Sequence, residues 1–332
     1  MRNFRWLASA ATVLMLLTPA WAADWPTRPI EISCFAAAGG GTDLVDRTIA
    51  KAMEPFLKTR INVVNRLGGG GGVVLDYVWS RPHDGYNWGG FSESIIPAPV
   101  MGAHTTSAKD WIYFMVAGAP GVISVRPESP YKTLDDLVKA AKAKPGELKA
   151  SASQTGGIWH TKLIALMQGA DIKFNFLPFN GSHPSQVAAM TGEADVVLTS
   201  VSEQAELLEA KKLIPLAMVE LKPYEFKGMK IPAAVEKYPD VGKLLPIDQW
   251  LGFALPADTP KEIIDKITDA FRKAMETDLV KDMAKTKNLS LYGYHGDQAQ
   301  KVARGMERVW TWALWDLKVA KKSPADFGIE KP

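Results

Sequence analysis

Glycine-rich segments between strand-like and helix-like stretches are the part of this sequence best suited to bind a ligand. The first is Ala38-Gly39-Gly40-Gly41-Thr42-Asp43, which follows an apolar run at residues 30–35 and precedes an amphipathic stretch. The first N–H groups of a helix lack partners within the helix and carry partial positive charge. We therefore predict that this segment holds an anion such as a carboxylate. The alternative is a tight turn with Thr42 as an ordinary N-cap residue.

Two later segments occupy the same position between a predicted strand and a predicted helix. Residues 151–160 include Trp159 and His160, and residues 179–183 include Asn180, Gly181 and Ser182. Their amide groups are expected to face the first segment across a cleft, where Trp159 would cover one face of a ligand. Core packing is the alternative for Trp159. Thr199, at the end of the predicted strand 194–199, completes this set of candidates.

An enzymatic interpretation has weaker support. Gly90-Phe91-Ser92-Glu93-Ser94 differs from the G-x-S-x-G nucleophile elbow at its fifth position. A hydrolase using Ser92 would also need an acid and a histidine close in space, and no signature marks them. The five histidines and the single Cys34 show no metal-binding spacing. We expect neither catalysis nor a cofactor nor a metal, with a hydrolase as a minor alternative.

The N-terminal 22 residues have the features of a secretory signal peptide. Arg2 and Arg5 precede an apolar run at residues 7–17, and Ala20-Trp21-Ala22 forms a small-x-small cleavage pattern. The run is short for a membrane span, which needs about 20 apolar residues, so an uncleaved anchor is the less favoured alternative. We expect cleavage after residue 22 and a mature protein in the periplasm.

Composition excludes several classes of protein. The 332 residues are 47% hydrophobic, so the chain is neither collagen-like nor disordered. The formal net charge is +3, and removal of Arg2 and Arg5 lowers it to +1. Such a nearly neutral chain offers no strong basic field for nucleic acid.

Strand-like and helix-like stretches alternate along the whole mature chain. This alternation predicts α/β architecture with parallel sheets covered by helices on both faces. The middle of the chain repeats the pattern without a flexible linker, so two halves must be joined by short crossings. We place these crossings near Pro120 and near Lys222.

Six short stretches, each unspecific alone, follow one another in a fixed order. They are Trp25-Pro26-Thr27-Arg28-Pro29-Ile30; Ala38 to Asp43 with Arg47; Val64-Asn65-Arg66 with Gly68; Asp84-Gly85-Tyr86; Gly192-Glu193-Ala194-Asp195; and Trp250-Leu251-Gly252 with Pro256, Thr259 and Pro260. Together they resemble motifs of the solute receptors of tripartite tricarboxylate transporters, also called the Bug family.

The resemblance implies a two-lobed periplasmic binding protein of type II. Two three-layer α/β domains would be joined by short crossover strands, with the ligand cleft between them. Residues 23–120 and 222–332 would form the first lobe, and residues 121–221 the second. The protein would be a monomer that takes a small carboxylate to membrane permease subunits. A receptor that signals to a sensor kinase is the alternative.

The resemblance also implies ligand contacts at specific positions. These are Ala38 to Asp43 and Ser92 in the first lobe, and Gly156, Gly157, Phe179, Asn180, Gly181 and Ser182 in the second. Phe179 and Asn180 replace the family's usual Tyr and Lys, which makes the cleft less polar. We therefore hypothesise an aromatic or bulky carboxylate, with Trp159 and Phe179 supplying apolar surface.

Overall fold

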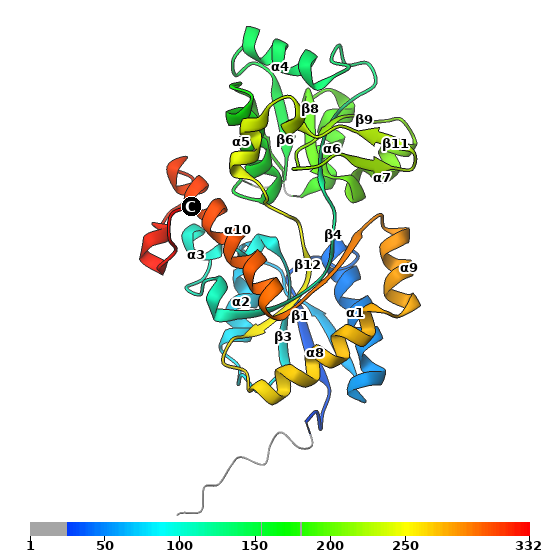
Figure 1. Cartoon of the computed structure of the whole chain (residues 1–332), viewed down its shortest axis with the longest axis vertical. Helices are drawn as coiled ribbons and strands as arrows, with labels where there is room; N and C mark the ends of the chain where they lie inside the picture. The colour runs from blue at the N-terminus through cyan, green and yellow to red at the C-terminus, as the bar shows by residue number, and fades with distance from the viewer. Residues whose placement is uncertain (1–24, 154, 180) are drawn as a thin grey trace, which may run out of the picture.

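Two β-sheets, each covered by helices on both faces, form two lobes stacked along the long axis of the molecule (Figure 1). The computed structural model describes residues 25–153, 155–179 and 181–332. The predicted signal peptide and Asn180 lie outside the described residues. Within those residues, no helix combines the length and apolarity needed to cross a bilayer.

The first lobe is built on a six-stranded sheet in the order β13-β4-β12-β3-β1-β2. Its strands are β1 (Ile30–Cys34), β2 (Ile61–Asn65), β3 (Asn87–Ser92), β4 (Trp111–Gly118), β12 (Leu251–Pro256) and β13 (Ser290–Tyr294). Its helices are α1 (Gly41–Leu57), α2 (Gly72–Trp79), α3 (Ala98–Met101), α8 (Lys261–Met275), α9 (Asp278–Thr286) and α10 (Gly296–Asp316). On one face, Ile49 of α1 and Phe271 of α8 belong to an apolar cluster with Trp88 and Phe253 of the sheet. On the other face, α2 and α10 pack against the sheet.

The second lobe is built on a five-stranded sheet in the order β7-β6-β8-β5-β9. Its strands are β5 (Gly121–Val125), β6 (Lys149–Ala152), β7 (Asn175–Pro178), β8 (Val196–Ser200) and β9 (Ile214–Met218). Its helices are α4 (Leu134–Ala143), α5 (Ile158–Gly169), α6 (Ser182–Thr191) and α7 (Val201–Glu209). Leu137 of α4 and Leu163 of α5 pack on one face, and Val201 and Leu208 of α7 pack on the other. The three-layer arrangement is therefore the same in both lobes.

The prediction of parallel sheets is wrong for part of each sheet. β1 is parallel to β2 and β3, and β6 is parallel to β7 and β8. However, β12 is antiparallel to β3 and β4, and β5 is antiparallel to β8 and β9. Neighbouring strands become parallel when a crossover helix returns the chain to the same end of the sheet. The chain enters β5 and β12 directly from the other lobe, without such a helix, so these two strands can pair antiparallel.

Strands β3, β4, β6 and β13 were among those not predicted. Glycine is depleted in strands, and β3 contains Gly89 and Gly90. The structure explains Gly90, because a Cβ atom there would lie 2.0 Å from Oδ2 of Asp46 on α1. Glycine thus allows α1, which carries the first predicted ligand segment, to lie close to the sheet.

The chain crosses between the lobes twice. The first crossing is at residues 119–120, between β4 and β5. After β9, the hairpin of β10 (Tyr224–Phe226) and β11 (Met229–Ile231) still packs on the second lobe, where Met218 N donates to Pro232 O at 2.8 Å. The 3₁₀ helix Pro239–Leu244 packs against α5. We therefore assign the return crossing to residues 246–250, not to Lys222.

Candidate functional site

A cleft of about 490 Å³ lies between the two lobes and is lined by both. Nine predicted ligand residues line it: Gly39, Gly40, Gly41, Thr42, Ser92, Gly157, Trp159, Gly181 and Ser182. Thr42 and Ser182 come from different lobes and share this cleft. Six predicted residues do not line it: Ala38, Asp43, Gly156, His160, Phe179 and Thr199.

Three helices from the two lobes begin at the cleft. The first helical hydrogen bond of α1 joins Leu44 N to Gly40 O at 2.9 Å, and that of α5 joins Thr161 N to Gly157 O at 3.0 Å. Helix α6 begins after Gly181, and none of these three N-caps makes a side-chain capping bond. The N–H groups of the first turns therefore point out of the helices without partners inside them. Together with the positive ends of the helix dipoles they form a site for an anion.

A fourth helix, α7, also begins at the cleft, but its end is already capped. Ser200 Oγ accepts a hydrogen bond from Glu203 N at 3.1 Å, and Glu203 Oε2 accepts one from Ser200 N at 3.0 Å. This reciprocal capping box leaves fewer free donors at α7 than at the other three helix starts. Glu203 also adds a carboxylate to the cleft lining.

Asp43 shapes the first loop and does not line the cleft. Its Oδ2 accepts hydrogen bonds from Gly39 N at 2.9 Å and Arg47 Nε at 3.1 Å, and its Oδ1 accepts one from Asn65 Nδ2 at 2.7 Å. Burial alone would raise the pKa of this carboxyl group. The hydrogen bonds from Arg47, Gly39 and Asn65 outweigh burial and hold the pKa below its usual value. These bonds give the Asp43 carboxylate a structural role in the loop.

Thr199 and Phe179 also lie outside the cleft lining. The buried Thr199 hydroxyl accepts hydrogen bonds from Gln186 Nε2 at 3.1 Å and Gln204 Nε2 at 3.0 Å. Of the hypothesised aromatic pair, Trp159 lines the cleft and Phe179 does not. The other apolar lining residues, which sequence reasoning missed, are Phe35, Ala36, Leu44, Ile158, Leu251 and Leu289.

His160 supports the α5 loop from behind the cleft. Its Nδ1 accepts a hydrogen bond from Gly156 N at 3.0 Å, and its ring stacks on Phe176 with centroids 4.1 Å apart. Burial lowers the pKa of His160 to about 4. The ring therefore stays neutral in the folded protein under conditions that protonate it in the unfolded chain.

We expect His160 to make the folded protein less stable at acidic pH. Between about pH 6.5, the pKa of an unperturbed histidine, and pH 4, only the unfolded chain binds the proton. The contribution of His160 to the free energy of unfolding should therefore fall by about 2 kcal/mol from pH 7.5 to pH 5. Urea denaturation gives the free energy of unfolding of the wild type and of His160→Gln at both pH values. The contribution of His160 is read from how the difference between the two proteins changes with pH. That difference removes the effect of other titrating groups, and a difference independent of pH would contradict the assignment.

Ser92 is hydrogen-bonded to its neighbour Ser94. Ser92 Oγ lies 2.9 Å from Ser94 Oγ and accepts a hydrogen bond from Ser94 N at 3.2 Å. Across the part of the chain that the structure describes, no hydrogen bond joins Ser92 to a histidine. The neighbouring Glu93, which sequence reasoning did not single out as a ligand residue, lines the cleft and is buried.

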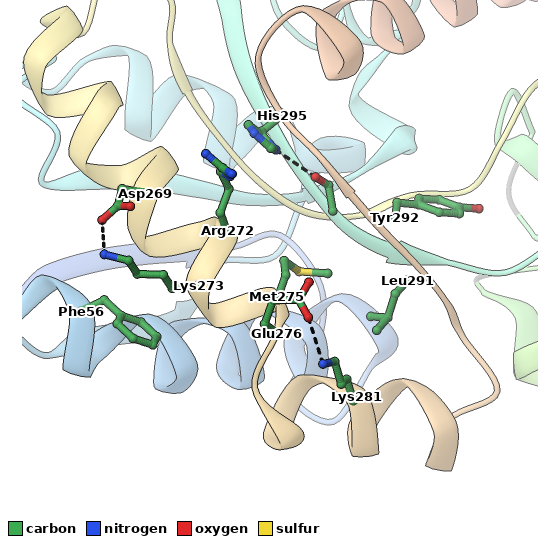
Figure 2. A pocket seen from close by; sticks show the side chains of 11 residues that line it. Phe56, Asp269, Arg272, Lys273, Met275, Glu276, Lys281, Leu291, Tyr292 and His295 are labelled. Carbon is green, nitrogen blue, oxygen red and sulfur yellow. Dashed lines mark hydrogen bonds and ion pairs between the residues drawn. The ribbon is translucent and has the colours of Figure 1, made fainter.

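A larger hollow, of about 790 Å³, lies on the first lobe alone (Figure 2). It is bordered by α1, α8, α9 and β13, and two ion pairs, Lys273–Asp269 and Lys281–Glu276, lie along it. These side chains are exposed and already paired. None of the described residues of the second lobe lines this hollow, so it does not have the two-sided geometry of the cleft.

Comparisons with known proteins agree with this geometry. The family model described as "Tripartite tricarboxylate transporter family receptor" matches residues 45–311. BugT of Bordetella pertussis is 26% identical over 274 residues, which cover 80% of this chain and 82% of BugT. A TctC solute-binding protein from Polaromonas, solved without ligand, has 24% identity and a TM-score of 0.74, covering 88% of this chain and 100% of that one. R. palustris Rpa4515, solved with adipate, has 22% identity and a TM-score of 0.76, covering 90% and 99%. The two-lobed periplasmic binding protein fold is thus confirmed, and the chain belongs to the tripartite tricarboxylate transporter receptor family.

Proposed function

We propose that this protein is an exported receptor that captures a small carboxylate between its lobes and delivers it to a tripartite tricarboxylate-type transporter. The observation that carries the proposal is the meeting of three helix N-termini, from α1, α5 and α6, at one cleft. Backbone N–H groups can hold a carboxylate without a basic side chain. Membership of the receptor family, and the adipate bound to Rpa4515, support a carboxylate as ligand.

Closure of the two lobes would couple binding to delivery. A ligand favours the closed form only through contacts that the open form lacks. A carboxylate held at α1 of the first lobe and at α5 or α6 of the second makes such contacts. The two crossings at residues 119–120 and 246–250 would serve as the hinge. The closed receptor would then present its ligand to the permease subunits from the periplasm as a monomer.

A thermal-shift screen of carboxylic acids against the chain from residue 23 onward tests the proposal. A ligand at ten times its Kd should raise the free energy of unfolding by about 1.4 kcal/mol and Tm by about 2 °C. Isothermal titration then measures Kd and stoichiometry for each hit, and uncharged amides of the same acids serve as controls. If no carboxylate raises Tm, or if the amides act equally well, carboxylate capture is contradicted. Uptake of a labelled hit by cells with and without the receptor tests delivery.

A further inference from the structure

Glu93 is an acidic side chain held inside a cleft that otherwise suits anions. It follows Ser92, the last residue of β3, and is 2% exposed. Its Oε2 accepts a hydrogen bond from Trp250 N at 3.2 Å, and its own N–H donates to Trp250 O at 3.2 Å. These bonds tie Glu93 to the return crossing between the lobes, so the carboxyl group has a fixed position in the cleft lining.

Glu93 has no cationic partner among the described residues. Of the groups around it, the buried Lys162 ammonium is already paired with Glu220, which also accepts a hydrogen bond from Gly121 N at 2.6 Å. Glu203 of α7 adds a like charge, and Tyr292 of β13 is neutral at physiological pH. Burial, reinforced by Glu203, raises the pKa of Glu93 to about 8. The carboxyl group is therefore mostly protonated at pH 7.

The remaining charge in the lining belongs to Lys287, which is exposed and makes no ion pair within the described part of the chain. The starts of α1, α5 and α6 offer N–H donors for a carboxylate. Two acids, Glu93 and Glu203, lie close enough to interact and line the same cleft. A second carboxylate of a ligand would meet the like charge of Glu203 there, and no cation pairs with Glu93 to offset it. An ammonium group would instead supply the cation that Glu93 lacks.

We propose that Glu93 and Glu203 select a ligand that carries an amino group besides its carboxylate. This inference rests on the proposed function: the carboxylate binds at the N-termini of α1, α5 and α6, and the ammonium binds at Glu93. The ligand class is thereby narrowed from small carboxylates to small amino carboxylates. Glu93 is a specificity-determining residue, because on losing its proton it pairs with the cationic end of the ligand, while the charge of Glu203 disfavours a second anionic end.

Binding of an amino carboxylate would also release a proton. The neutral Glu93 carboxyl group gives its proton to the buffer, and the resulting carboxylate pairs with the ligand ammonium. At pH 7 a group with pKa about 8 is roughly nine-tenths protonated, so release should approach one proton per ligand. A dicarboxylate leaves Glu93 protonated and releases none.

Isothermal titration at pH 7 with matched probes tests this inference. Each α- or ω-amino acid is compared with the alkanoate of the same length and with the corresponding dicarboxylate, in buffers of low and high ionisation enthalpy. We expect the best amino acid to bind at least tenfold more tightly than its two counterparts and to release about one proton. Tighter binding of the dicarboxylate would overturn the inference and leave the proposed function intact. Failure of every probe to bind would contradict both.

Variants separate a selective role from a structural one. Glu93→Gln keeps an acceptor for Trp250 N–H but should lower the affinity for the amino acid about tenfold and abolish proton release, while dicarboxylate binding stays equal or improves. Glu203→Gln should reduce the preference by a smaller factor. Glu206→Gln removes the same charge from an exposed position on α7 outside the cleft lining and should change nothing. If Glu93→Gln does not fold, the number of protons that the wild type releases still tests the inference. An amino acid that binds to the wild type without proton release would overturn it.

Discussion

Replacing Gly41 with leucine should lower the affinity for the carboxylate ligand about a hundredfold and leave the fold intact, a loss of about 2.7 kcal/mol in binding free energy. Gly41 is the first residue of α1 and lines the cleft. A Cβ atom there would meet only Leu251 Cδ1, at 3.7 Å, so the backbone accepts a side chain without strain. The leucine side chain would lie beside Leu251 in the cleft and cover the N–H groups of the first turn. Those groups are the proposed anion site.

Isothermal titration with the best hit of the carboxylate screen measures this loss. Gly305→Leu is the matched control, because Gly305 is an exposed position within α10 where a Cβ atom would have no neighbour within 4 Å. Both variants gain the higher helix propensity of leucine, so both should be at least as stable as the wild type. If Gly41→Leu binds with unchanged affinity, the start of α1 is not part of the ligand site.

The parts of the site that sequence reasoning found are those that local patterns determine. Glycines before an amphipathic stretch predict a helix start wherever they occur, and the starts of α1, α5 and α6 all lie near the predicted positions. Their meeting at one cleft depends on the topology, which the family resemblance supplied. Gly41 and Gly181 therefore line the same cleft although 140 positions separate them in the sequence.

The parts that sequence reasoning missed depend on contacts between distant segments. Glu93 becomes a buried cleft residue because the return crossing places Trp250 beside it, and nothing near Glu93 in the sequence indicates this. At the edge of the cleft, Ser202 Oγ of the second lobe donates to Lys287 O of the first at 2.5 Å. Asp43 presents the opposite case: its place in the motif suggested a ligand contact, but Arg47 and Asn65 occupy its carboxylate. Motif position therefore predicts where a segment lies better than which side chains face the ligand.

The second large effect concerns the ion pair between Lys162 and Glu220 beside the first crossing. Lys162 of α5 is completely buried, and Glu220 also accepts the N–H of Gly121, the first residue of β5. Burial raises the pKa of Glu220, while the Lys162 ammonium acts in the opposite direction. Glu220→Gln keeps an acceptor for Gly121 but leaves Lys162 without a counter-charge in a buried site. The free energy of unfolding should fall by about 3–5 kcal/mol.

Urea denaturation at pH 7 measures this loss, and two further variants identify its cause. Glu209→Gln breaks a comparable pair with Lys227 on the surface, where both side chains are about half exposed, and should cost less than about 1 kcal/mol. Adding Lys162→Met to Glu220→Gln removes the unpaired charge and should restore part of the stability, since well-packed apolar groups can replace a buried ion pair at little cost. If Glu220→Gln costs no more than Glu209→Gln, or if the double variant is less stable than Glu220→Gln alone, the buried pair does not support the crossing through its charge. The start of β5 would then be supported by the packing of Trp159 against Gly121, whose Cβ position lies 3.0 Å from the indole ring.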